Sequence, residues 1–84
     1  GDVYKRQETN NEVTFEITEH IGVIAEHPTG WTKELNRVDW NHKGNPKYDI
    51  RDWDEEHLRM SRGITLHEDE AKRLCDLLKD RLYN

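Results

Sequence analysis

Lys47-Tyr48-Asp49-Ile50-Arg51-Asp52-Trp53 is the stretch of sequence that decides the fold. Side chains alternate along a β-strand, so this stretch would have two different faces. One face would carry Lys47, Asp49, Arg51 and Trp53, and the other Tyr48, Ile50 and Asp52. The second face can pack inward. The first would set two cations beside an indole within reach of solvent.

Two strands and a turn are predicted before this stretch. In the first strand, six apolar residues share odd parity, and they are Val13, Phe15, Ile17, Ile21, Val23 and Ala25. Gly22 marks a bend or bulge in it. Residues 28–30 should form a turn and residues 31–40 the second strand. Because Leu35 and Val38 have opposite parity, we expect a bulge or strong twist in that second strand.

A hairpin loop, a turn and a fourth strand complete the predicted sheet. Residues 41–46 include Gly44 and Asn45 and form the hairpin loop. Residues 54–60 carry helix-forming side chains behind a capping aspartate, so we expect one short helical turn there. Residues 61–66 form a short fourth strand, in which Gly63 lets the chain bend or approach another backbone closely.

The C-terminal segment is the clearest element, an amphipathic helix. Its apolar residues recur at helical spacing, and they are Ala71, Leu74, Cys75, Leu78 and Leu82. Leu77 lies beside this stripe and widens it to roughly 160°, more than one small sheet covers. The same helix of a twin subunit would bury the remainder. We therefore expect a homodimer interface that contains Leu74, Leu77, Leu78 and Leu82.

Composition limits the chain to one small domain. Its 84 residues are 32% apolar and 37% charged, a size at which a single core is marginal. The sequence has no apolar run long enough for a membrane, and no charged stretch followed by an apolar one suggests a signal peptide. Its single cysteine excludes an internal disulfide. We expect a cytoplasmic protein in a reducing compartment. Residues 1–7 are interpreted as a non-native scar or disordered segment, and residues 8–84 as one domain.

The charge distribution favours a local binding stripe over a general affinity for polyanions. The net charge is −5, whereas duplex-binding domains are usually basic. Residues 8–26 contain five acidic side chains and no Lys or Arg, whereas residues 33–62 contain seven basic and seven acidic ones. Cations therefore gather on the central strands and their loops. A cation beside an indole is the chemistry that single-stranded nucleic acid requires.

The order of these motifs resembles the positive cofactor 4 (transcriptional coactivator) family. The resemblance rests on Trp40, the 47–53 strand and Gly63-Ile64-Thr65-Leu66, and it covers about residues 13–82. Gly30-Trp31-Thr32-Lys33-Glu34-Leu35-Asn36 and Trp40-Asn41 look like its bacterial YdbC-like branch. The resemblance implies an α+β fold, a four-stranded curved antiparallel sheet followed by one C-terminal helix (β-β-β-β-α). Two chains would pair through their helices.

The resemblance also implies which residues bind nucleic acid. Two tryptophans would stack on bases and one arginine would contact phosphate or base edges: Trp40, Trp53 and Arg51. Five cations would contact the backbone, the last two from loops of variable length: Lys33, Arg37, Lys47, Lys43 and Arg62. The chain departs from the family in charge, because eukaryotic members carry more lysine around the hairpin.

Packing is an alternative role for the same residues. Tryptophans in small domains are usually core, but Trp53 shares parity with Lys47 and Arg51, cations that rarely point into a core unpaired. Trp40 shares parity with Val38, so packing and stacking fit it equally well. Arg51 could instead pair with a neighbouring aspartate, an exposed arrangement worth about 0 to 1 kcal/mol.

Metal binding and catalysis fit the sequence poorly. The densest cluster of ligand types, residues 52–57, matches no zinc spacing, and His57 has no second histidine at i+3 or i+4. The sequence also lacks a Gly-rich phosphate loop and a nucleophile setting. We expect no cofactor, no metal and no enzymatic activity.

The leading hypothesis is a homodimer that binds single-stranded DNA with little sequence preference. RNA is a further candidate ligand, the nucleoid its expected location and the transcription machinery a candidate partner. The alternative is a protein-interaction module of transcription or repair that never contacts nucleic acid. Binding of duplex nucleic acid or of structured RNA is a third hypothesis, and the net charge of −5 disfavours it.

Overall fold

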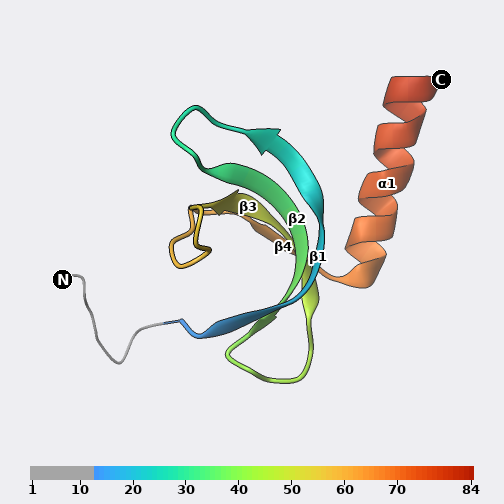
Figure 1. The fold of residues 1–84 in the computed structure, drawn as a ribbon. Helices are drawn as coiled ribbons and strands as arrows, with labels where there is room; N and C mark the ends of the chain where they lie inside the picture. The colour runs from blue at the N-terminus through green and yellow to red at the C-terminus, as the bar shows by residue number, and fades with distance from the viewer. Residues whose placement is uncertain (1–12) are drawn as a thin grey trace.

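The computed structural model describes residues 13–84, so the predictions for residues 1–7 lie outside the described residues. It contains four strands followed by one helix: β1 (Phe15–Glu26), β2 (Thr32–Trp40), β3 (Lys47–Trp53), β4 (Ile64–Leu66) and α1 (Glu68–Tyr83). The strands form one antiparallel sheet in the order β1-β2-β3-β4 (Figure 1). The predicted α+β fold and its element order are confirmed.

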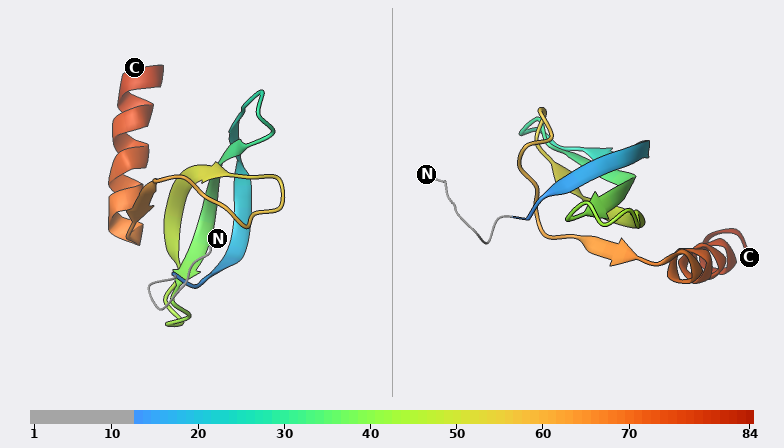
Figure 2. Two further views of the ribbon diagram at one scale, coloured as in Figure 1. Left: turned by 90° about the vertical axis from the view of Figure 1, so that its left-hand side faces the viewer. Right: turned by 90° about the horizontal axis from the view of Figure 1, so that it is seen from below.

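Bulges in β1 accompany the curvature of the sheet. The pairing of β1 with β2 shifts register at three places, Ile17/Glu19, His20/Gly22 and Val23/Ala25. Each shift adds a residue on β1, which bends the longer strand around the shorter one. The bend predicted at Gly22 is confirmed. The sheet curls so that α1 lies on its convex side and the β3–β4 connection on its concave side (Figure 1, Figure 2).

The bulge expected in the second strand is wrong. β2 pairs with β3 in continuous register from Thr32 to Val38. Leu35 and Val38 have opposite parity because they pack on opposite faces of the sheet. Leu35 faces α1, whereas Val38 is fully buried among the aromatic side chains on the other side.

Cross-strand pairing sorts the side chains of β2 and β3 into two faces. We call one the concave face, formed by Thr32, Glu34, Asn36, Val38, Trp40, Lys47, Asp49, Arg51 and Trp53. The convex face carries the alternate residues Lys33, Leu35, Arg37, Tyr48, Ile50 and Asp52. Five concave-face residues are nearly or fully inaccessible to solvent, namely Glu34, Asn36, Val38, Asp49 and Trp53.

The β3–β4 connection folds back over the concave face. The Asp54 carboxylate accepts hydrogen bonds from the backbone N–H groups of Leu58 and Arg59, at 2.8 and 2.9 Å. These hydrogen bonds hold the connection, but Asp54 caps no helix, and the helical turn predicted for residues 54–60 is wrong. His57 has a φ of 60°, a left-handed conformation that interrupts a right-handed helix.

Gly63 allows β4 to lie directly against β3. A Cβ atom at this position would collide with the carbonyl oxygen of Ile50 and the Cβ of Arg51. The close backbone approach predicted for Gly63 is confirmed. It also brings the Ser61 carbonyl and the Thr65 hydroxyl to 3.4 and 3.5 Å from the Arg51 guanidinium.

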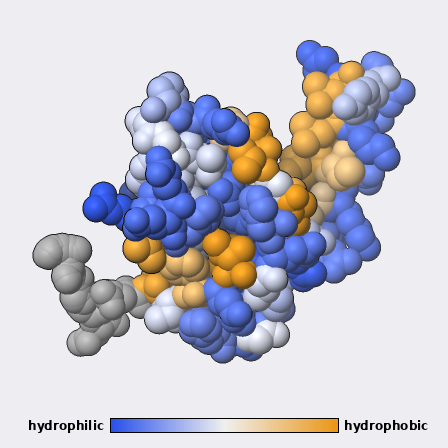
Figure 3. Space-filling view, viewed as in Figure 1, coloured by the Kyte–Doolittle hydropathy of each residue, from blue (hydrophilic) through white to orange (hydrophobic). Residues whose placement is uncertain are grey.

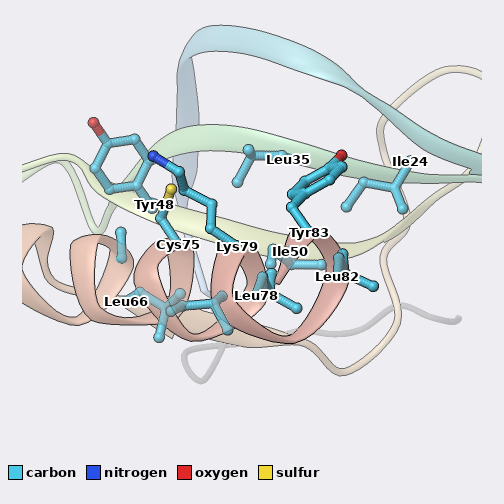
Figure 4. Close-up of a pocket in the computed structure, with 12 residues that line it drawn as sticks. Ile24, Leu35, Tyr48, Ile50, Leu66, Cys75, Leu78, Lys79, Leu82 and Tyr83 are labelled. Carbon is cyan, nitrogen blue, oxygen red and sulfur yellow. The ribbon is translucent and has the colours of Figure 1, made fainter.

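Helix α1 lies along the convex side without closing onto the sheet. None of its residues is buried, and an open apolar groove of about 370 Å³ separates it from β2, β3 and β4 (Figure 4). The helix lines this groove with its predicted stripe, Ala71, Leu74, Cys75, Leu78 and Leu82. Leu77 lies beside the groove and is 49% exposed. Figure 3 shows the apolar side of α1 turned toward the sheet. No helix of the described residues is long and apolar enough to cross a membrane.

Candidate functional site

A buried ion pair fixes Arg51 on the concave face. Its Nε and Nη2 atoms donate to the two carboxylate oxygens of Asp49, at 2.5 and 2.8 Å. Asp49 is 0% exposed and the Arg51 side chain 13%. The Thr65 hydroxyl donates to the same carboxylate at 2.8 Å. A bidentate pair of this kind holds the guanidinium plane in one orientation. The alternative in which Arg51 pairs with a neighbouring aspartate is confirmed for Asp49, but the pair is buried and not exposed as expected.

The held guanidinium lies over an indole. The Arg51 Cζ atom is 4.7 Å from the centre of the Trp40 ring, within the range of a cation–π contact. Trp40 is half-buried, and its other neighbour is Phe15, with ring centres 6.0 Å apart. Two flat groups, one cationic and one aromatic, therefore remain partly accessible beside each other on the concave face.

Trp53 occupies the core beneath this pair. Its side chain is 0% exposed, and its ring packs against Phe15 at 5.2 Å and stacks on His57 at 5.7 Å between ring centres. The expectation that a base can reach Trp53 is therefore wrong for this structure. The parity argument failed because Arg51 shares the face of Trp53 but is paired with Asp49, so this face can be buried.

The predicted cations do not gather on one face. Lys47 shares the concave face with Arg51, whereas Lys33 and Arg37 point to the convex side. Arg37 lies over the Tyr48 ring at 4.9 Å and donates to the Pro46 carbonyl at 3.1 Å. Lys43 is exposed in the β2–β3 connection, and Arg62 is exposed in the β3–β4 connection. The structure thus brings together Trp40, Trp53, Arg51 and Lys47, and it separates the other four.

A carboxylate with two histidines is the part of the concave face that sequence reasoning missed. Glu34 is 3% exposed and accepts hydrogen bonds from Thr32 Oγ1 at 2.5 Å, from Asn36 Nδ2 at 3.1 Å and from His57 Nε2 at 2.9 Å. His20 Nδ1 lies 3.5 Å from Glu34 Oε1 and 2.7 Å from Asn36 Oδ1. These residues come from β1, β2 and the β3–β4 connection, so no local spacing marks them. The one available signal was the alternating polar run Thr32, Glu34, Asn36.

The hydrogen bonds to Glu34 determine its charge. Burial by itself would raise the pKa of this carboxyl. The hydrogen bonds from Thr32, Asn36 and His57, together with the charge of His57, act in the opposite direction and prevail. The pKa of Glu34 therefore lies below its ordinary value of 4.5, and the carboxylate is ionised at neutral pH. Within residues 13–84, no group of three or more His, Cys, Asp and Glu side chains is arranged to hold a metal ion.

Comparison with known proteins identifies the family. The family described as Transcriptional Coactivator p15 (PC4) matches residues 27–77, which hold β2, β3, β4 and much of α1. The chain belongs to the PC4 family. It is also 39% identical over 70 residues to an uncharacterized protein of Treponema pallidum (strain Nichols), a match that spans 82% of this chain and 80% of that protein. Membership in the PC4 family suggests nucleic-acid binding and a coactivator-like function.

The residues that match the PC4 family include part of the concave face. The matched residues include Trp40, Arg51, Glu34 and His57. Strand β1 precedes the match, so His20 and the aromatic contact of Phe15 come from outside it. The Arg51–Trp40 pair therefore belongs to the part of the chain that the PC4 family shares.

Proposed function

We propose that this PC4-family protein binds single-stranded DNA along its concave face, with little sequence preference and with RNA as a second ligand. The observation that carries the proposal is the Arg51 guanidinium, held by Asp49 and lying over Trp40. Such a pair offers flat surface to any base, while the charge of Arg51 is balanced by Asp49. Stacking contributes about 1 to 3 kcal/mol per base and tolerates any sequence, so binding does not need a basic protein.

The buried Trp53 has a supporting role in this proposal. It packs against Phe15, and Phe15 in turn contacts the Trp40 ring. A rigid base beneath the stacking surface lowers the entropy that binding must remove from the protein. Lys47, on the same face as Arg51, would contact the phosphate backbone. Lys43 and Arg62 would reach it from the exposed connections.

The second copy of the chain belongs in the groove on the convex side. Leu74, Leu78 and Leu82 line this groove, and Leu78 and Leu82 are 48% and 66% exposed in the single chain. The α1 helix of a twin subunit has the apolar stripe that would cover them. We propose a homodimer of the YdbC-like kind, with Leu77 at the edge of the helix contact. Each subunit would keep its concave face open to a strand.

Preference for an open strand explains how binding could act on transcription. A protein that binds only the single strand lowers the free energy of the melted state by RT ln(1 + [L]/Kd). Strand opening at a promoter would then become more favourable without catalysis. We place this role at the nucleoid, in the cytoplasm, with the transcription machinery as the partner.

Fluorescence anisotropy of a labelled oligothymidine tests the proposal. The wild type should bind the single strand at low salt, and the matching duplex should compete poorly. Trp40→Ala should weaken binding about 5- to 150-fold, the loss of one stacked base. Trp31→Ala is the matched control, because Trp31 lies at the turn between β1 and β2, away from Arg51.

The outcome that contradicts the proposal is absence of single-strand binding at low salt in a folded wild type. That result would favour the alternative, a protein-interaction module that uses the apolar groove and never contacts nucleic acid. An RNA of the same sequence, titrated in parallel, ranks the two candidate ligands.

A further inference from the structure

A small pocket lies on the concave face beside the core. It has a volume of about 290 Å³ and is lined by Ile17, His20, Glu34 and His57. The side chains come from three parts of the chain, since β1 supplies the first two, β2 the third and the β3–β4 connection the last. The pocket is therefore formed only when the connection folds back over the sheet (Figure 1).

The two histidines are the accessible polar groups of this pocket. The side chains of His20 and His57 are 53% and 38% exposed, whereas that of Glu34 is 3% exposed. Each imidazole uses one ring nitrogen inside the network, Nδ1 of His20 and Nε2 of His57. Within residues 13–84, the other ring nitrogen of each makes no hydrogen bond with the protein. Each of these free ring nitrogens can donate to a ligand when its imidazole is protonated.

The buried carboxylate is not available to a ligand in the same way. Its two oxygens already accept hydrogen bonds from Thr32, Asn36 and His57. Glu34 therefore acts on a ligand through its charge and through the orientation that it gives His57. This arrangement disfavours a nucleobase edge as the ligand, because a base would need unoccupied carboxylate oxygens.

The net charge of the pocket depends on the protonation of the imidazoles. Asp49 and Arg51, the charged groups of β3 nearest Glu34 in the sheet register, neutralise each other in their ion pair. Glu34 contributes a negative charge throughout the neutral range. Histidine changes charge between about pH 5 and 8. With both imidazoles neutral the cluster carries one negative charge, and with both protonated it carries one positive charge.

We propose that His20 and His57 form a proton-dependent site for a backbone phosphate of the bound strand. The proposal rests on the function proposed above, since the site lies on the same face as the Arg51–Trp40 pair. Protonated imidazoles would donate from their accessible nitrogens to phosphate oxygens, and Glu34 would stabilise the imidazolium of His57. Binding of the strand would then be coupled to proton uptake, and affinity would rise as pH falls.

Titrations at pH 6 and pH 8, at fixed ionic strength, test the site with labelled oligothymidine. The wild type should bind about tenfold more tightly at pH 6 than at pH 8, a gain within what the uptake of one or two protons can supply over this range. His20→Gln and His57→Gln should each show a smaller gain in affinity between pH 8 and pH 6 than the wild type. Gln at position 57 keeps a donor for Glu34, and circular dichroism confirms that each variant is folded.

His27→Gln is the matched control. His27 also pairs with a carboxylate, Asp52 at 3.1 Å, and its side chain is 35% exposed. Its partner, however, belongs to the convex face. The pH dependence of binding should be unchanged in this variant.

Calorimetry in two buffers of different ionisation enthalpy measures the protons directly. At pH 7 the wild type should take up protons when it binds oligothymidine, and the double variant His20→Gln/His57→Gln should take up fewer. Tight binding with no proton uptake and no pH dependence would overturn this inference and leave the proposed function standing. Retention of the full pH dependence by the double variant would also overturn it. Absence of binding at both pH values would instead contradict the proposed function.

Discussion

The two sides of the sheet differ in how far the charged and apolar side chains find partners within one chain. On the concave face the buried carboxylates are paired, Asp49 with Arg51 and Glu34 with His57. On the convex side the apolar residues of α1 are partnered only in part, and Leu82 remains 66% exposed beside an open groove. The buried charges of the concave face are therefore paired within one chain, although the indole N–H groups of Trp40 and Trp53 are buried without a hydrogen-bond partner, whereas the convex side leaves apolar surface exposed.

This difference has a consequence for specificity. Buried polar networks hold one geometry, because each donor and acceptor has a single suitable partner. An apolar groove imposes no such restriction and gains free energy from any apolar surface of matching shape. The concave face is thus suited to a ligand that must be oriented, and the convex groove to stable association with a copy of the chain.

The largest expected effect concerns the core of the concave side. Trp53→Ala should destabilise the fold by about 3 to 5 kcal/mol, because it removes a fully buried indole and leaves a cavity beside Phe15. Urea unfolding followed by circular dichroism measures this loss. Trp31→Ala, at a partly exposed position, should cost much less. Equal losses in the two variants would show that Trp53 is not the centre of the core.

The next largest effect tests whether the convex groove is the dimer interface. Leu78→Asp should weaken dimerisation by about 3 kcal/mol or more, because it would bury a charge between two helices. The single chain should tolerate the change, since Leu78 is 48% exposed there. Sedimentation equilibrium measures the shift to monomer. Leu58→Asp, at a 72% exposed position of the β3–β4 connection, should leave the mass unchanged. A dimer that persists in Leu78→Asp would rule out the helix interface.

Most of the fold could be predicted because its elements follow local rules. Alternation with period 2 located β3, and apolar spacing of three and four residues located α1. The opposite parity of Leu35 and Val38 led to the wrong prediction of a bulge because the pattern has two structural explanations. A bulge within one strand and two packed faces produce the same pattern, and only the position of α1 distinguishes them.

The site was harder to predict because it depends on register. Asp49 and Arg51 are two residues apart, so their pairing could be anticipated, but its burial could not. His20 lies opposite Asn36 and near Glu34 because β1 has an extra residue between Ile17 and Glu19, a register shift that no sequence pattern located. Trp53 was assigned to solvent on the charge of its neighbours, although that charge is neutralised on the same face.

A smaller effect, with a defined pH dependence, tests the hydrogen-bond network around Glu34. Glu34→Gln should destabilise the fold by about 1 to 3 kcal/mol at neutral pH, because charge-assisted hydrogen bonds are lost. The pKa of Glu34 is lowered in the folded state, so its ionised form stabilises the fold above about pH 4.5. That stabilisation disappears as pH falls through the folded pKa. The difference between wild type and variant should therefore shrink below pH 4.5 in urea unfolding. Glu16→Gln, at an exposed position of β1, should show no such trend.

The smallest effect compares two lysines of similar exposure on opposite faces. Lys47 lies on the concave face and Lys33 on the convex face, and both are partly exposed. A lysine that neutralises one phosphate of a single strand contributes about 0.7 to the slope of log K against log salt. Lys47→Ala should therefore reduce the magnitude of that slope by about 0.7, whereas Lys33→Ala should leave it unchanged. Anisotropy titrations of oligothymidine at several salt concentrations measure both. If Lys33→Ala changed the slope and Lys47→Ala did not, the strand would have to lie on the helix side of the sheet. The groove would then be a nucleic-acid channel and not a dimer interface, which reverses the assignment of the two faces.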